Sequence, residues 1–306
     1  MGTSWDSLGE KPLVTRSRPG MPVGPYELVR LVGCGGMTEV WLARRVDGAS
    51  EREVALKLPA SFRLRGDVAR RFSRERDFLA GLEHPGIARF YDAGVSADGE
   101  PYFAMEYVSG KTITDSCDAA RLAISEKLRL FLQVLEAVQY AHERGVLHRN
   151  IKPSNVLVTE SGQVRLLDFA VMFQHADAAL TLRHERVLTP AYSSPEEIRD
   201  ADAELGPASD VYSLGVLLYE LLCGRRPYQL EAGELLAHVL AVERASTRVA
   251  IESALSRMQA LAHLTYTLRR DLEAILLKAL AFEAGQRYSS AQAMAADLRR
   301  YLERRP

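Results

Sequence analysis

The stretch at residues 148–155 constrains the fold more than any other, because its polar side chains lie among apolar runs typical of short strands. It reads His-Arg-Asn-Ile-Lys-Pro-Ser-Asn and is followed closely by Leu-Asp-Phe-Ala at residues 167–170. Apolar residues flank both pieces at 145–147, 156–158 and 164–167. We predict a polar loop between short strands, a turn at Ser161 and Gly162, and a strand ending in an acidic residue.

The polar side chains of this stretch are suited to a metal and phosphate. Asn155 and Asp168 lie at the ends of adjacent predicted strands, and oxygen ligands are those that Mg²⁺ prefers when phosphates complete its shell. Lys152 adds a mobile positive charge near them. The loop contains no carboxylate, because the position that would accept a proton holds the amide Asn150.

Bulk properties narrow the class of protein. The chain of 306 residues is long enough for one large two-lobed domain, and its net charge of -1 gives no electrostatic signal for nucleic acid. Three cysteines form neither a disulfide framework nor a zinc spacing. The most apolar run, residues 214–223, is too short to span a bilayer and contains Glu220. We therefore expect a cytoplasmic location, no nucleic-acid partner, no signal peptide and no membrane segment within this chain.

Hydrophobic patterns divide the chain into a leader and two parts. Residues 1–23 predict a flexible leader, and residues 24–108 predict a β-rich lobe with one helix at 68–82. The strands of that lobe are expected at 26–32, 40–44, 52–57, 87–91 and 101–107. Residues 109–306 predict a mainly helical lobe, with helices at 124–144, 208–222, 231–243, 268–280 and 290–302. The pattern indicates the α+β class.

Two features of the first lobe indicate a phosphate site. Gly33, Gly35 and Gly36 lie at the tip of the first hairpin, where a backbone without Cβ atoms can approach phosphate oxygens. Lys57 ends the third strand, after Val-Ala-Leu. Each has a plain structural alternative, since a glycine-rich tip is usually a tight turn and a strand-end lysine is usually solvated.

Taken in order, these pieces resemble the protein kinase family, in particular the bacterial eukaryotic-like Ser/Thr kinases, over residues 24–302. The resemblance implies a two-lobed protein-kinase-like fold. Its N-lobe is a small five-stranded antiparallel sheet with one helix, and its C-lobe is larger and mainly helical. It also implies that ATP, with Mg²⁺, binds between the lobes and that a protein is the partner or substrate.

The resemblance assigns residues to that site. Lys57 would hold the α- and β-phosphates, with Glu75 as its partner, and Met105 would be the gatekeeper. Asn155 and Asp168 would bind the metal, while Lys152 and Thr189 follow the Ser/Thr-type pattern of the catalytic site. The implied nucleotide-binding residues are Val32, Gly33, Gly35, Gly36, Val40, Ala55, Lys57, Glu75, Met105, Glu106, Val108 and Leu157.

Other motif positions are implied to be structural. His148 is expected to pack in the core rather than act as an acid or base. Asp210 is expected to hydrogen-bond the backbone of the catalytic loop from the start of a buried helix. Glu196, at the end of the activation segment, is expected to pair with Arg287.

Three positions depart from the family pattern. The family aspartate that accepts the proton of the substrate hydroxyl is Asn150 here, and Thr38 and Ala170 replace two motif glycines. An amide can orient a hydroxyl but cannot take its proton, and general-base catalysis typically contributes ~10²–10⁴-fold. The residues implied to bind nucleotide and metal are retained.

Three interpretations follow from these residues. In the first, the chain is a catalytically impaired pseudokinase that binds ATP and serves as a scaffold or regulator. In the second, it is an active or weakly active Ser/Thr protein kinase that transfers the γ-phosphate to protein hydroxyls. In the third, it is an interaction domain without nucleotide, which the presence of Lys57 and Asp168 disfavours.

Overall fold

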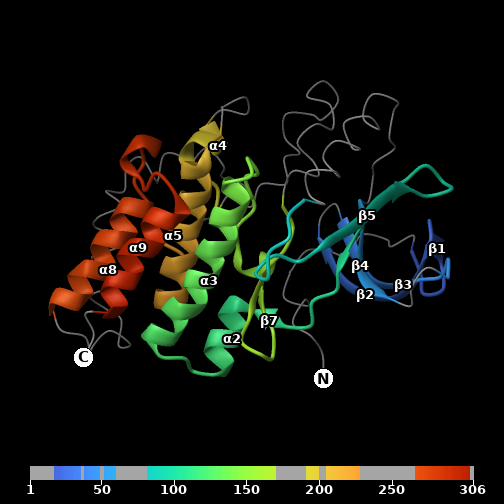
Figure 1. Ribbon diagram of the computed structural model, residues 1–306, viewed down its shortest axis with the longest axis horizontal. Helices are drawn as coiled ribbons and strands as arrows, with labels where there is room; N and C mark the ends of the chain where they lie inside the picture. The colour runs from blue at the N-terminus through green and yellow to red at the C-terminus, as the bar shows by residue number, and fades with distance from the viewer. Residues whose placement is uncertain are drawn as a thin grey trace. The chain divides into compact units, whose positions relative to one another are not determined.

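The computed structural model describes residues 17–35, 38–48, 52–59, 81–169, 191–199, 205–227 and 266–303. The chain divides into two compact units at Lys111 and Thr112 (Figure 1). The helices expected at 68–82 and 231–243 lie outside the described residues.

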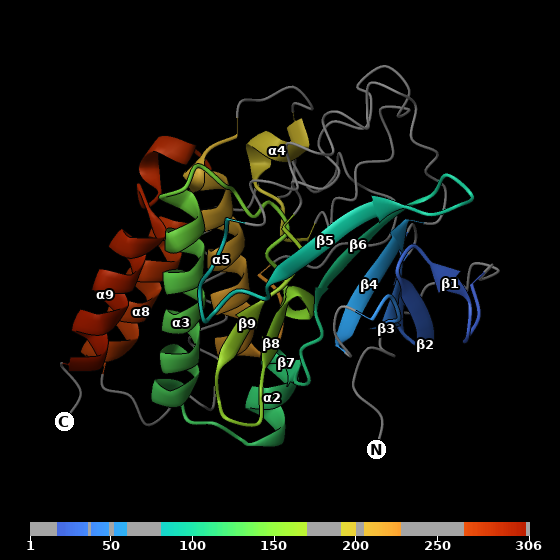
Figure 2. The same cartoon turned by 45° about the vertical axis from the view of Figure 1, so that its right-hand side comes forward.

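The first unit contains a six-stranded antiparallel sheet with the strand order β1-β2-β3-β4-β6-β5 (Figure 2). Most neighbouring strands are also consecutive in the sequence, as expected for antiparallel strands joined by short connections, whereas β4 pairs with β6 rather than with β5. The strands are β1 (Pro22–Val23), β2 (Tyr26–Gly35), β3 (Thr38–Arg45), β4 (Glu53–Pro59), β5 (Phe90–Val95) and β6 (Pro101–Glu106).

Strand β1 corrects the expected boundary of the leader and adds one strand to the five expected. Pro22 and Val23 pair with the start of β2, and the N–H of Leu28 donates to the carbonyl of Met21 over 3.0 Å. Gly24 has φ +57°, which a glycine adopts without strain, so a tight turn joins the two strands. The end of the predicted leader is therefore part of the sheet.

The register of the sheet separates two sets of side chains. Trp41 pairs with Leu56, and both belong to a buried apolar cluster on one face. Val40 pairs with Lys57. Because successive side chains of a strand point to opposite faces, this second pair lies on the other face. The sheet therefore keeps its main apolar cluster away from the candidate site residues.

The second unit is mainly helical. Helices α3 (Ile124–His142), α5 (Pro207–Cys223), α8 (Tyr266–Ala279) and α9 (Ala291–Glu303) lie side by side in both views (Figures 1 and 2). Helix α5 is buried on almost all sides, as expected from its long apolar run, and its buried residues also include the polar Ser209, Asp210 and Ser213. The shorter elements are β7 (Lys111–Thr112), α2 (Ile113–Ala119), η1 (Pro153–Asn155), β8 (Val156–Val158), β9 (Val164–Leu166), α4 (Pro195–Arg199) and η4 (Ala284–Gln286).

The apolar run at 145–147 is not the strand expected before the polar loop. Gly145 has φ +74°, and the N–H of Val146 donates back to the carbonyl of Ala141 over 3.0 Å. These contacts terminate α3, so the N–H groups that a strand would use for pairing cap the helix instead. The predicted hairpin after the loop is confirmed, with Gly162 at its turn joining β8 and β9.

Candidate functional site

The first unit places several candidate residues on one face of its sheet. Val40 pairs with Lys57, and Ala55 pairs with Met105, so the four side chains lie on the face opposite Trp41. Lys57 is only 8% exposed, and lysines are seldom buried unless they are paired. Its expected partner, Glu75, lies outside the described residues.

The glycine-rich segment is part of the β2–β3 ladder up to its tip. Gly33 pairs with Val40, and Gly35 pairs with Thr38. A register irregularity between Leu31 and Gly33 bends the strand just before the glycines. Thr38, which replaces a motif glycine, therefore occupies an ordinary strand position in β3, whereas Gly36 lies outside the described residues. Val32, the implied residue before the glycines, is buried.

The segment after β6 offers a backbone donor that fits a nucleotide base. Glu106 is fixed at the end of β6, because its N–H donates to the carbonyl of Arg89 over 2.7 Å. Tyr107 accepts a 2.7 Å hydrogen bond from Nη2 of Arg30. Val108 is 8% exposed, and its N–H donates no hydrogen bond within the described chain. A buried N–H without an acceptor is rare, so this donor fits a ligand such as adenine.

In the second unit, the carboxylate of Asp210 holds the catalytic loop. It accepts the backbone N–H groups of His148 and Arg149 over 2.8 and 2.7 Å. It also accepts a 2.7 Å hydrogen bond from Nε2 of His142. Burial by itself raises the pKa of Asp210, but these donors outweigh burial and hold the pKa below its ordinary value. The expected role of Asp210 is confirmed.

His148 is a structural residue whose ring is neutral. Its Nδ1 accepts the N–H of Asn150 over 3.2 Å, and its Nε2 donates to the carbonyl of Leu167 over 2.8 Å. Only a neutral ring has one acceptor and one donor nitrogen. Burial lowers its pKa, and the ring packs on Phe169 with centroids 4.5 Å apart. The expectation of a core histidine is confirmed.

Asn155 connects the loop to the two strands that follow it. Its Nδ2 donates to the carbonyl of Asn150 over 2.7 Å, and its own carbonyl accepts the N–H of Leu167 over 2.8 Å. Within the described chain Oδ1 of Asn155 has no hydrogen-bond partner, so it remains available to a metal. Lys152 lies between the two asparagines, and Leu157 is buried in β8.

The donor set fits Mg²⁺ that is shared with phosphate. Asp168 lies two residues after the end of β9 and has φ +53°, a left-handed conformation that is uncommon for residues other than glycine. Within the described chain no cluster of three or more acidic, histidine or cysteine side chains could hold a metal alone. Asn155 and Asp168 would supply two oxygens to such an ion, and phosphate and water would complete the shell.

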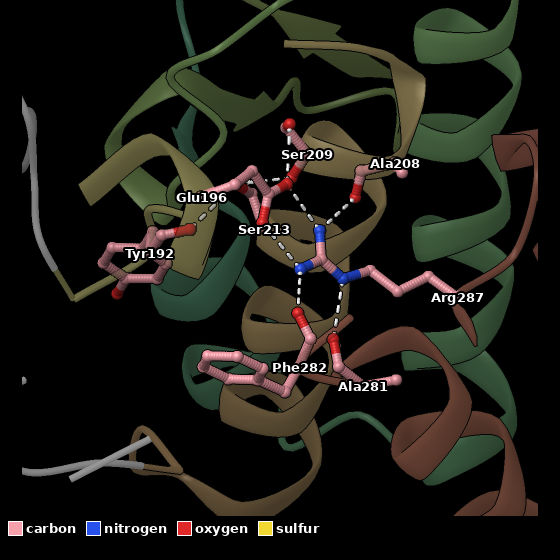
Figure 3. Close-up of polar contacts among 8 residues, drawn as sticks. All are labelled: Tyr192, Glu196, Ala208, Ser209, Ser213, Ala281, Phe282 and Arg287. Carbon is pink, nitrogen blue, oxygen red and sulfur yellow. Dashed lines mark hydrogen bonds and ion pairs between the residues drawn. The ribbon is translucent and has the colours of Figure 1, made fainter. Parts of the chain in front are cut away.

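Elsewhere in the second unit, Arg287 binds Glu196 in an ion pair (Figure 3). Two of its nitrogens donate to the Glu196 carboxylate, each over 2.7 Å. The other donors reach the carbonyls of Ala208, Ala281 and Phe282, so all five N–H groups of the guanidinium are used. Burial alone raises the pKa of Glu196, but Arg287 outweighs it and lowers the pKa. The expected pair is confirmed.

Sequence reasoning missed two side chains that support these segments. His142 is the third donor to Asp210 and lies 68 residues from it in the sequence. Glu220 accepts a 2.5 Å hydrogen bond from the hydroxyl of Tyr192, near the end of the activation segment. The sequence did offer one signal for Glu220, because an acidic residue within an apolar run indicates a buried carboxylate with a hydrogen-bond partner. Thr189 lies outside the described residues.

Comparisons with known proteins agree with this geometry. The family model of the protein kinase domain matches residues 26–298. The chain is 34% identical over 295 residues to a probable serine/threonine-protein kinase of Streptomyces coelicolor, covering 92% of this chain and 41% of that protein. It is 32% identical over 283 residues to PrkC of Bacillus subtilis, covering 90% of this chain and 40% of PrkC.

A third relative is PknB of Mycobacterium tuberculosis, 34% identical over 285 residues, with 89% of this chain and 42% of PknB covered. The chain thus spans about two fifths of the length of these curated relatives. In the part of the chain that the structure describes, no helix has the length and apolar character needed to cross a membrane. The chain belongs to the protein kinase family, with its antiparallel N-lobe sheet and helical C-lobe, and is similar to the bacterial eukaryotic-like serine/threonine kinases.

Proposed function

We propose that this chain binds ATP with Mg²⁺ and is impaired in phosphoryl transfer, so that it acts as a scaffold or regulatory partner of another protein. The observation that carries the proposal is the amide of Asn150 within an otherwise intact catalytic loop. The loop backbone is held by Asp210 and His148, so the change at this position alters the chemistry and leaves the framework in place.

Nucleotide binding is supported in each unit separately. The first unit presents Lys57, Val40 and Ala55 on one sheet face and the buried N–H of Val108 after β6. The second unit presents Oδ1 of Asn155 near the Asp168 backbone, because the N–H of Leu167 donates to the carbonyl of Asn155. Asn155 and Asp168 would hold Mg²⁺, which would supply positive charge against the phosphates.

The impairment follows from the chemistry of an amide. The substrate hydroxyl loses a proton as it attacks the terminal phosphate, and a carboxylate at position 150 would accept that proton. Oδ1 of Asn150 can accept a hydrogen bond from the hydroxyl but cannot hold its proton at neutral pH. Positioning by Lys152 and the metal ligands would remain. We therefore expect transfer to be slower by about 10²–10⁴-fold than with an aspartate.

The second candidate function is an active or weakly active Ser/Thr protein kinase. It is favoured by the presence of Lys57, Asn155 and Asp168 at the motif positions and by relatives named as serine/threonine-protein kinases. Phosphoryl transfer depends largely on positioning and electrostatics, which these residues retain.

The experiment that separates the two candidates measures transfer of the γ-phosphate to the chain itself and to a basic protein substrate. The parent and Asn150→Asp are compared, with Asp168→Asn as a control for contaminating kinases. We expect Asn150→Asp to be faster by about 100-fold or more. A parent rate equal to that of an ordinary kinase, roughly 1–100 per second, would refute the impairment. No gain in Asn150→Asp would show that position 150 is not the limiting defect.

A further inference from the structure

The catalytic loop fixes the backbone of Asn150 but leaves its side-chain amide unpaired within the described chain. The N–H of Asn150 donates to Nδ1 of His148, and its carbonyl accepts from Nδ2 of Asn155. Neither Oδ1 nor Nδ2 of Asn150 makes a hydrogen bond to any described residue, and the residue is half-buried. The side-chain amide is therefore available to hydrogen-bond a ligand.

Asn155 holds the backbone of Asn150 beside the proposed metal site. The two residues are joined by the 2.7 Å hydrogen bond from Nδ2 of Asn155 to the carbonyl of Asn150. That bond leaves Oδ1 of Asn155 for the metal, so a metal-bound phosphate would lie close to Asn150. Asn150 and Asn155 are also the only two asparagines in the sequence. The chain therefore uses this residue type solely in this loop.

An amide and a carboxylate at position 150 affect a neighbouring phosphate in opposite ways. The residue that receives the proton of the attacking hydroxyl lies beside the terminal phosphate in phosphoryl transfer. A carboxylate there repels the phosphate oxygens, whereas an amide carries no charge and offers two N–H donors. The asparagine thus removes a group that assists transfer and adds one that can bind the unreacted phosphate.

Resting on the proposed function, we propose that Asn150 selects an intact nucleoside triphosphate over a diphosphate. Nδ2 of Asn150 donates a hydrogen bond to the γ-phosphate, which a diphosphate lacks. Hydrogen bonds to charged groups are among the stronger ones in proteins, so the preference is measurable. The chain then remains loaded with unreacted triphosphate.

Calorimetric titration of the full chain with Mg²⁺ tests this proposal. The β,γ-imido analogue of ATP, which does not transfer its phosphate, is compared with ADP for the parent, Asn150→Ala and Asn150→Asp. The preference is the affinity for the triphosphate analogue divided by the affinity for ADP. We expect it to be highest in the parent, lower in Asn150→Ala and lowest in Asn150→Asp. The overall fall should be about tenfold, the size of one hydrogen bond to a charged group. The affinity for ADP should stay the same. Gln163→Glu, which adds the same charge on the exposed β8–β9 turn, should leave the preference unchanged.

The outcomes distinguish this proposal from the proposed function. Equal preferences in all three proteins, or the strongest preference in Asn150→Asp, would overturn the role of Asn150. A preference in Asn150→Ala equal to that of the parent would overturn the hydrogen bond. If neither nucleotide binds to any of the proteins, nucleotide binding itself fails, and the proposed function fails with it.

Discussion

At the scale of single residues, Asp210 and His148 share the task of holding the catalytic loop. Asp210 needs its negative charge, because it accepts N–H groups from His148, Arg149 and His142 while almost fully buried. His148 needs to be neutral, because one ring nitrogen accepts and the other donates. The loop geometry therefore depends on both groups being deprotonated, Asp210 as an anion and His148 as a neutral ring, and hydrogen bonding and burial favour these forms.

This dependence predicts how stability changes with pH. The pKa of His148 is lowered from 6.5, so the unfolded chain binds a proton that the native chain excludes as the pH falls. The stabilisation is present above the unfolded pKa and is lost on acidification, with a slope of up to about 1.4 kcal/mol per pH unit. We expect His148→Phe to be less stable at pH 7.5 but to show a shallower slope down to pH 5.5.

Urea unfolding at half-unit pH steps measures the two slopes. The denaturant dependence of the free energy of unfolding should be the same in both proteins, which shows that they expose similar surface. Parallel slopes would mean that the His148 ring is not kept neutral in the native state.

At the scale of elements, Arg287 binds together segments that are far apart in the sequence. It joins η4 to α4 through Glu196 and to the start of α5 through Ala208 (Figure 3). Its side chain is fully buried, so losing it would leave three carbonyls without this donor and the Glu196 carboxylate with the hydroxyl of Ser209 but no cation. Breaking a buried ion pair from one side typically costs about 3–5 kcal/mol.

We therefore expect Arg287→Ala to lower the free energy of unfolding by about 3–5 kcal/mol, measured in urea. The matched control is Arg299→Ala, which removes the same side chain from an exposed pair between Arg299 and Glu136. Exposed pairs contribute about 0–1 kcal/mol, so the control should change little. The loss of unfolding free energy in Arg287→Lys should lie between those of the two alanine variants, because lysine keeps the charge but loses the planar set of donors. Equal losses in the two alanine variants would contradict this account.

The elements that could be predicted from sequence are those with long patterns or dense motifs. Helices α3 and α5 follow their apolar spacing, and the Glu196–Arg287 pair follows from motif positions. Short elements were missed because tertiary contacts and caps stabilise them. Helix α2 is an example, since it has only seven residues and begins where Thr112 accepts the N–H of Asp115. His142 was missed because a contact across 68 residues leaves no local pattern.

At the scale of the whole molecule, some of the residues proposed to bind the nucleotide belong to the first unit and others to the second. Lys57 and Val108 belong to the first unit, and Asn155 and Asp168 belong to the second. The proposed Mg²⁺ has its protein ligands in the second unit only, whereas the proposed contacts to the base lie mainly in the first. Hydrogen exchange with and without metal therefore separates the contributions of the two units.

With Mg²⁺ and the β,γ-imido analogue of ATP, we expect slower amide exchange in both units at the same nucleotide concentration. The protected peptides should contain β2 and β3, Val108, the loop at 148–155, and Asp168, because ligand binding to the native state suppresses local opening. Without Mg²⁺, protection of the loop and of Asp168 should be largely lost, since Asn155 and Asp168 act on phosphate through the metal. Protection confined to the first unit even with Mg²⁺ would show that the base binds without use of the metal ligands. The intact second-unit framework around Asp210 would then hold the loop without serving nucleotide.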